Sequence, residues 1–306
     1  MRRMTKTIKR LNEIRIVTHC VSDLDTEIAT WADYLGYELC DRGQLPADLC
    51  KAWGAPREAG NDYAIMAPAS GVDVYIRFVA TGPRPGYWPP VTWGWNATEI
   101  LVQDPDSLAL ELDGSPIRRF GGPMDLTRQP KAPRAMQTLG PSGAMLYFAR
   151  LLPGGSRYGL HGAKTRVDRI FNVILGGPSL SELRNFYRDT LGMRVGEPMG
   201  FTGTLAAQAC DAPPDALFPI CVAPVRARNS ILELDEYPEN SSPRPRDDGC
   251  MPGGMSMVSF DTTTLETMPV RLRSAPVTIN AFPYRGRRVA VAEGPAGEWL
   301  ELIETG

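Results

Sequence analysis

Residues 10–39 read RLNEIRIVTHCVSDLDTEIATWADYLGYEL. The β-branched and apolar residues from Ile14 to Val21 predict a strand. Ser22 and Asp23 then offer capping oxygens to a helix. Its apolar residues recur at i, i+4, i+7 and i+11 and form one face: Leu24, Ile28, Trp31 and Leu35. Gly36 suits the left-handed conformation that ends a helix, so the stretch predicts strand, turn and amphipathic helix.

The same pattern returns 156 residues later. Residues 166–195 read RVDRIFNVILGGPSLSELRNFYRDTLGMRV, and Arg10, Leu24 and Leu35 correspond to Arg166, Leu180 and Leu191. After the helix the first copy predicts strands at 37–40, 62–67 and 72–80, with a short helix at 45–53. The second copy predicts its last two strands at 220–223 and 231–234. The chain therefore contains a duplicated β-α-β-β-β unit.

Each half continues into a second, weaker unit. In the first half we expect a strand at 98–102, a helix near 107–112 and a last strand at 145–152. In the second half the corresponding segments are 255–260, a shorter helix at 264–272, and 299–303. The turn at 140–143 (GPSG) recurs at 294–297 (GPAG). These patterns predict an α+β protein with one paired β-α-β-β-β domain at 1–152, a linker at 153–166 and a second paired domain at 167–306.

Composition excludes several classes of protein. The 306 residues are 43% hydrophobic and 22% charged with a net charge of −2, which is ordinary for a globular protein and gives no footprint for nucleic acid. No run approaches ~18 apolar residues, and the basic start lacks the apolar segment of a signal peptide. The six cysteines form no CxxC pair, which favours free thiols in a reducing compartment. We therefore predict a cytoplasmic protein with no membrane or nucleic-acid partner.

A segment rich in proline, glycine and aromatic residues interrupts the pattern at 81–95. One interpretation is a connecting loop whose aromatic residues pack on the edge of a sheet. The other makes Trp93 and Trp95 part of a wall for an apolar ligand. A polar segment at 238–254, also rich in proline and glycine, predicts a second long loop.

The paired β-α-β-β-β repeat, with VSDLD before the helix and a Leu-Gly pair after it, resembles the vicinal oxygen chelate superfamily. That group includes glyoxalase I, bleomycin-resistance proteins and extradiol dioxygenases. The ending GPAGEWLEL at 294–302 is similar to the DPxGxxxEL ending of the family. The resemblance implies that paired modules curl their strands into two cupped mixed sheets, each around a small-molecule cavity.

The resemblance also implies where a metal would be held: on the first strand of each module in a pair and on the final strand. In the second half these positions match Asn172, Met255 and Glu301. In the first half they match Ile16, then Ala97 or Thr98, and finally Tyr147.

The histidines do not fit these positions. The chain has two, His19 and His161. Strand alternation turns His19 to the face opposite Ile16, and His161 lies in the predicted linker. One carboxylate and one amide bind a transition metal poorly without imidazole or thiolate. We therefore predict no metal cofactor, with a divalent iron or manganese ion at unusual ligands as the alternative.

Glu301 is then the leading candidate for chemistry. On its strand it shares a face with Trp299, and a carboxyl group in an apolar cup can act as a general base. Asn172 or Tyr147 would hold a developing oxyanion. For each residue a structural role is the competing interpretation. His19 is either a proton shuttle at a binding site or, as we expect, a partly exposed residue on the outer face.

Three functions compete on this basis. The first is an enzyme that performs lyase- or isomerase-like proton transfer on an apolar or aromatic catabolic metabolite, bound by Met255, Trp299 and neighbouring tryptophans. The second is a non-catalytic protein that sequesters a hydrophobic ligand. The third is a metal-dependent dioxygenase. Each has a small molecule as its partner, and the sequence leaves a homodimer open.

Overall fold

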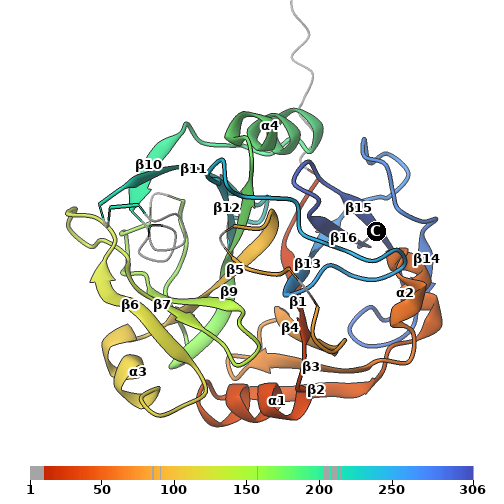
Figure 1. Ribbon diagram of the computed structural model, residues 1–306, viewed down its shortest axis with the longest axis horizontal. Helices are drawn as coiled ribbons and strands as arrows, with labels where there is room; N and C mark the ends of the chain where they lie inside the picture. The colour runs from red at the N-terminus through yellow and green to blue at the C-terminus, as the bar shows by residue number, and fades with distance from the viewer. Residues whose placement is uncertain are drawn as a thin grey trace, which may run out of the picture.

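The structure is a computed structural model of the chain, and it describes residues 10–84, 86–89, 91–156, 158–202, 207, 212–213 and 215–305. In these residues the strands form two curled eight-stranded sheets that lie side by side (Figure 1). Four modules supply them: module 1 (14–80), module 2 (94–150), module 3 (167–236) and module 4 (255–304). The predicted α+β class and cupped mixed sheets are confirmed.

The first sheet has the order β14-β15-β16-β13-β1-β4-β3-β2. We call it the terminal sheet because it joins the first module to the last. Module 1 contributes β1 (Ile14–Val21), β2 (Tyr37–Gln44), β3 (Asp62–Pro68) and β4 (Tyr75–Ala80). Module 4 contributes β13 (Met255–Thr262), β14 (Val277–Ile279), β15 (Arg287–Glu293) and β16 (Trp299–Glu304). The two modules meet where β1 pairs antiparallel with β13.

The second sheet has the order β10-β11-β12-β9-β5-β8-β7-β6, and we call it the central sheet. Module 2 contributes β5 (Gly94–Val102), β6 (Arg118–Asp125), β7 (Arg134–Leu139) and β8 (Met145–Arg150). Module 3 contributes β9 (Val167–Gly177), β10 (Met199–Thr202), β11 (Leu217–Pro224) and β12 (Ile231–Glu236). Here the modules meet at the antiparallel pair β5–β9.

The pairing of modules differs from the sequence-based division. We expected each half, 1–152 and 167–306, to build its own cup. Instead each sheet is formed by one module from each half, because β1 pairs with β13 and β5 pairs with β9. Such pairing depends on contacts between distant strands, which the repeat in the sequence does not encode. Residues of both halves therefore line each cup.

The helices follow the local signals closely. Asp23 accepts a hydrogen bond from the Thr26 backbone N–H and caps α1 (Leu24–Asp33), and Ser179 caps α4 (Leu180–Asn185) in the same way. The remaining helical segments are α2 (Ala47–Trp53), the 3₁₀ turn η1 (Pro56–Glu58), α3 (Pro105–Glu111) and the π-helical turn η2 (Phe186–Thr190). The predicted helix at 264–272 is wrong: this segment forms turns, and Pro269 lacks the N–H that a helix interior needs.

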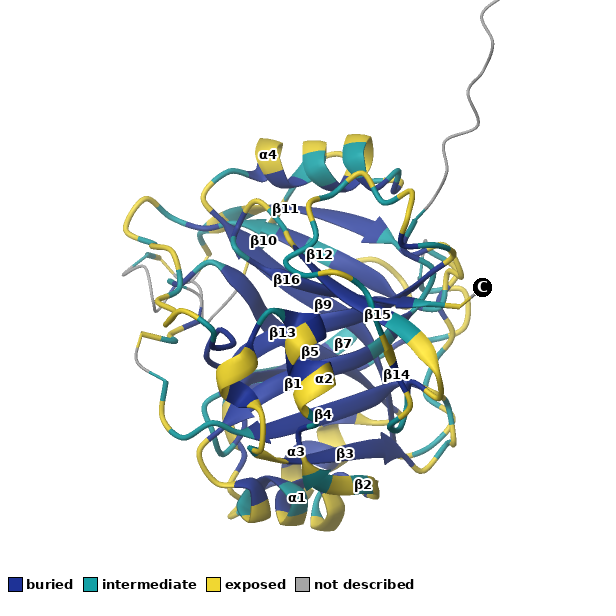
Figure 2. Ribbon diagram, turned by 90° about the vertical axis from the view of Figure 1, so that its right-hand side faces the viewer, coloured by how far each residue is buried: buried dark blue, intermediate teal, exposed yellow. Residues whose placement is uncertain are grey.

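The main hydrophobic core lies between the sheets and under α1, α3 and α4. It joins Trp31 of α1 to residues of both sheets, among them Phe148, Val173 and Phe260. The strands are buried, while exposed residues are concentrated on the helices and loops (Figure 2). The helix α2 packs on the other face of the terminal sheet, so the two cups differ in what covers them. No helix among the described residues is long and apolar enough to span a membrane.

Candidate functional site

Polar side chains form a row across the floor of the central sheet. Gln137 on β7 pairs with Tyr147 on β8, Tyr147 pairs with Glu99 on β5, and Glu99 pairs with Asn172 on β9. Glu233 on β12 lies two residues beyond the partner of Asn172. Directly paired residues point to the same face of a sheet, so the row faces one side.

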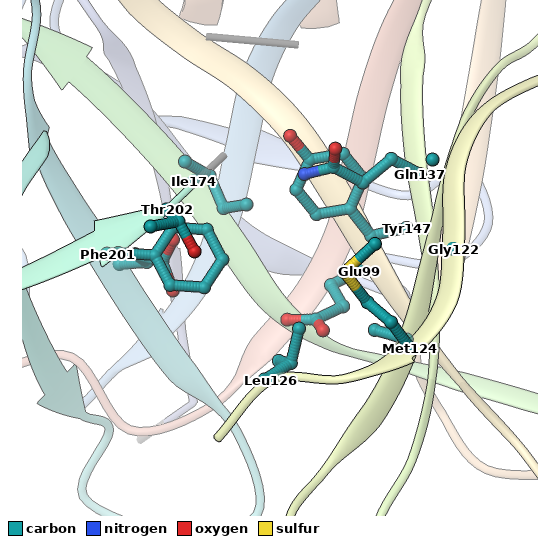
Figure 3. A pocket seen from close by; sticks show the side chains of 12 residues that line it. Glu99, Gly122, Met124, Leu126, Gln137, Tyr147, Ile174, Phe201 and Thr202 are labelled. Atoms are coloured by element: carbon teal, nitrogen blue, oxygen red, sulfur yellow. The ribbon is translucent and has the colours of Figure 1, made fainter. Parts of the chain in front are cut away.

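This row lies at the bottom of a cavity of about 520 Å³, the open space at its mouth included. The strand β6 and the end of β10 form its sides, and the labelled side chains point toward its centre (Figure 3). The walls are mainly apolar: Met124, Leu126, Ala135, Ile174 and Phe201. Gly122 lets β6 pass close to β7, because a Cβ at this position would lie 2.4 Å from the Ala135 carbonyl oxygen. Water-sized spheres fit into only about 60 Å³ of this space, so an organic ligand would extend from the row into the open mouth.

Glu99 is the titratable group best placed for chemistry. The Asn172 amide donates a hydrogen bond from Nδ2 to Glu99 Oε2 at 2.8 Å, and both residues are buried. The carboxyl group points into the cavity (Figure 3). Burial raises the pKa of Glu99 to about 7, against the opposing effect of the Asn172 hydrogen bond. At neutral pH both protonation states of Glu99 are therefore populated.

Two further carboxyl groups lie nearby on β12. Burial, followed by repulsion from Asp235 and Glu99, raises the pKa of Glu233 well above its usual value. Burial also raises the pKa of Asp235. The pKa of Tyr147 is raised by burial and by these carboxylates, so its phenol keeps its proton and can donate a hydrogen bond.

The terminal sheet carries a corresponding row with different chemistry. Val291, Glu301, Ser259 and Ile16 are paired in sequence across β15, β16, β13 and β1, and Arg77 on β4 takes the place of Glu233. Arg77 and Glu233 are 156 residues apart, which is the offset of the repeat. One row therefore contains a cation where the other contains an acid.

Glu301 is completely enclosed by donors. Its Oε1 accepts hydrogen bonds from Trp53 Nε1 at 2.5 Å and from the Tyr284 hydroxyl at 2.7 Å. Its Oε2 accepts one from the Ser259 hydroxyl and forms an ion pair with Arg77 Nη2 at 3.4 Å. Trp53, on α2, also stacks on the Arg77 guanidinium at 4.5 Å. This cup is thus filled by its own side chains.

Several solved structures resemble nearly the whole chain. Glyoxalase I from Zea mays superposes with a TM-score of 0.63 at 14% identity, covering 95% of this chain and 92% of that one. A putative dioxygenase from Bacillus subtilis subsp. subtilis str. 168 superposes with a TM-score of 0.62 at 11% identity, covering 97% and 86%. The chain has the vicinal oxygen chelate fold. No protein-family model and no curated protein sequence matches it.

The resemblance implied that a metal, where one is used, would be held on the strands that carry these rows. The central row does not fit an iron or manganese triad. It has no imidazole or thiolate, and the Asn172 amide turns its N–H, not its oxygen, toward Glu99. In the terminal row the Arg77 guanidinium already supplies the positive charge beside Glu301. Among the described residues, no three His, Cys, Asp or Glu side chains are grouped to hold a metal.

We accordingly expect the purified protein to contain well under one iron or manganese ion per chain. Elemental analysis after growth in medium supplemented with both metals measures this directly, and a chelator should leave the melting temperature unchanged. Stoichiometric iron or manganese would show that the rows bind metal despite their donor set.

The structure separates the residues that we expected to work together. Asn172 and Tyr147 lie in the central row, whereas Glu301 lies in the terminal row and does not line the cavity. A proton transfer to Glu301 from a substrate held by Asn172 or Tyr147 is therefore geometrically excluded. The reason is the crossed pairing of modules, which places β16 and β9 in different sheets.

Two first-strand positions also differ from the prediction. The residue beside Glu301 is Ser259 and not Met255, which pairs with His19 at the far end of the β1–β13 ladder. Met255 is fully buried and its sulfur accepts a hydrogen bond from the Thr98 hydroxyl at 3.5 Å. On β5 the row position belongs to Glu99, in place of Ala97 or Thr98.

His19 does face away from Ile16, as alternation predicted, but it is buried and not partly exposed. Its Nε2 lies 3.2 Å from the Thr98 hydroxyl oxygen, between the two sheets. Burial, followed by the positive charge of Arg244, lowers the pKa of His19 to about 3. It is thus a neutral core imidazole at neutral pH and does not line the central cavity.

The three tryptophans lie outside the central cavity as well. Trp95 is fully buried and donates its Nε1–H to the Trp299 carbonyl oxygen, which links β5 to β16. Trp93 donates to the Ser241 hydroxyl and lines a separate polar surface hollow. The Trp299 ring packs under the Arg273 guanidinium at 4.1 Å.

Gln137 and the cavity walls on β6 and β10 were not predicted from the sequence, and neither Glu99 nor Glu233 was assigned a role. One signal was available for Glu233. The 156-residue offset relates it to Arg77, and a change of charge at equivalent positions marks a difference between the two cups.

Proposed function

We propose that the protein is an enzyme that transfers a proton on a small organic molecule bound in the central cavity, with Glu99 as the general base. The observation that carries this proposal is the carboxyl group of Glu99. It is oriented by Asn172, points into an apolar cavity and has a pKa of about 7. A general base is most effective when its pKa lies near the working pH.

The neighbouring groups suit proton removal from a carbon next to a carbonyl. Glu99 accepts the proton, the electron pair of the C–H bond forms a C=C bond, and the π pair of the carbonyl moves to its oxygen, giving an enolate. The Tyr147 phenol, adjacent to Glu99 in the row, donates a hydrogen bond to that oxygen. Return of the proton to a different carbon completes an isomerisation, and expulsion of a leaving group completes a lyase reaction.

Hydrogen exchange tests this directly without knowledge of the natural substrate. We choose propiophenone, a neutral aryl ketone, as the probe and follow loss of its α-proton signal in D2O by NMR. The protein should accelerate exchange, and Glu99→Gln should reduce the catalysed rate by about 100-fold or more, which is within the range for a general base. The amide keeps the shape of the side chain but cannot accept the proton.

Glu301→Gln is the matched control, because it makes the same chemical change in the other row. It should leave the catalysed rate unchanged when circular dichroism confirms that the variant is folded. Full exchange activity in Glu99→Gln, or loss in Glu301→Gln alone, would contradict the proposal.

A non-catalytic ligand-binding protein is the second candidate, and the apolar walls of the cavity favour it. Saturable binding of the ketone with no exchange above the uncatalysed rate would support this function over the first.

A further inference from the structure

The described residues that line the central cavity offer several hydrogen-bond acceptors and no cationic side chain. Glu99, Glu233 and Gln137 are the acceptors, and none of the described lining residues is lysine, arginine or histidine. Among these residues Tyr147 supplies the one phenol donor. Carboxyl groups in an apolar site are costly to ionise without a positive partner. The lining supplies no such partner, so a positively charged ligand would stabilise the ionised carboxylates.

Unpartnered oxygens point to the same conclusion. Asn172 is 1% exposed, yet its Oδ1 has no hydrogen-bond partner, and the same is true of Gln137 Oε1 and of Asp235 Oδ1. Asn172 lies between Glu99 and Glu233, since its Nδ2 donates to the first and its amide stabilises the charge of the second. A buried acceptor without a donor costs free energy, and Gln137, which lines the cavity, therefore favours a ligand that brings an N–H group.

Comparison with the terminal cup shows what is missing. There Arg77 occupies the position of Glu233, and its guanidinium donates to Glu301, Tyr284 and Thr18. In that cup Arg77 is the cation, and the side chains around Glu301 occupy the interior. The central cup has the acid at the equivalent position and an open cavity beside it.

We infer that the natural ligand of the central cavity is an organic amine, with its ammonium group beside Glu233 and its apolar body against Met124, Leu126, Ile174 and Phe201. An ammonium brings three donors and one positive charge. The apolar walls favour an organic cation over a bare metal ion, because an inorganic ion would leave them uncovered. This inference rests on the proposed function for its site and names the class of substrate.

Binding should also depend on pH. The titratable groups that face Glu99 are Glu233 and Asp235 on β12 and the Tyr147 phenol on β8, with Tyr237 beyond Asp235. A bound ammonium favours the ionised carboxylates, so it binds more tightly once they have lost their protons. Burial and the neighbouring acids raise the pKa of Glu233, so affinity should rise from pH 6 to pH 8, where a simple amine stays protonated.

Three compounds of one shape test the inference by calorimetry: 2-phenylethylamine, 2-phenylethanol and phenylacetate. At pH 7.5 the amine should bind about 10- to 100-fold more tightly than the alcohol, and the carboxylate should bind most weakly. Glu233→Gln should remove most of this preference. Glu239→Gln, which changes an exposed acid, is the matched control and should keep it.

Equal affinity for the amine and the alcohol in the unaltered protein would overturn the inference, and this comparison needs no variant. Stoichiometric binding of Mn²⁺ or Mg²⁺ alone that displaces the amine would also overturn it, by showing that the acids hold a metal. The proposed function fails separately, because its exchange assay uses a neutral ketone and the Glu99→Gln variant.

Discussion

Replacing Arg77 with methionine is expected to lower the free energy of unfolding by about 3–5 kcal/mol, the usual result of removing one partner from a buried ion pair. Arg77 is 1% exposed and donates hydrogen bonds to Thr18, Tyr284 and Glu301. Without the guanidinium, the Glu301 carboxylate would remain in the core with only neutral donors. Equilibrium denaturation in urea measures the change.

Two controls make this result specific. Arg42→Met removes a cation from a solvent-exposed pair with Asp25 and should change stability by less than about 1 kcal/mol. The double variant Arg77→Met/Glu301→Gln should recover part of the loss, because it also removes the unpaired charge. If Arg77→Met were no more destabilising than Arg42→Met, the pair would contribute little to the fold.

Trp53→Ala is expected to lower the free energy of unfolding by a comparable amount, about 3–5 kcal/mol. The substitution removes the largest side chain that α2 places in the terminal cup. Trp53 is fully buried, stacks on Arg77 and donates its indole N–H to Glu301. The substitution leaves a cavity and removes one of the donors to a buried carboxylate.

Thermal and urea denaturation compare this variant with Trp88→Ala, whose ring is 61% exposed and whose loss should hardly change stability. Trp53→Phe separates the two contributions, since it retains most of the volume and loses only the hydrogen bond. A stable Trp53→Ala protein would show that α2 does not hold the cup closed.

The fold could be predicted from the sequence because the same helix caps and strand patterns occur at equivalent positions in both halves of the chain. Asp23 and Ser179 are helix caps at equivalent places, and the 156-residue offset continues through the fourth strand of each copy. The strand at Ile14–Val21 is found with the predicted ends. Such features depend on neighbours in the chain, so they can be inferred without knowledge of the tertiary structure.

The candidate site was less predictable for two physical reasons. Strand alternation assigns faces only while the ladder is regular, and β5 has register shifts between Trp95 and Ala97 and between Glu99 and Ile100. These irregularities moved the row position to Glu99. The second reason is that Trp53 and Arg77 fill the terminal cup through contacts with Glu301, more than two hundred residues away in the chain. Glu301 therefore matched the family ending in sequence while lying in the cup where side chains surround it.

The crossed pairing of modules gives the chain a nested order. All strands of the central sheet come from residues 94–236, inside the two segments, 14–80 and 255–304, that make the terminal sheet. During synthesis the ribosome therefore releases every strand of the inner sheet before the outer one can be completed. Until β13 emerges, β1 has a free edge at the place where the two halves of the terminal sheet later join, and the last fifty residues close a structure that the first eighty began.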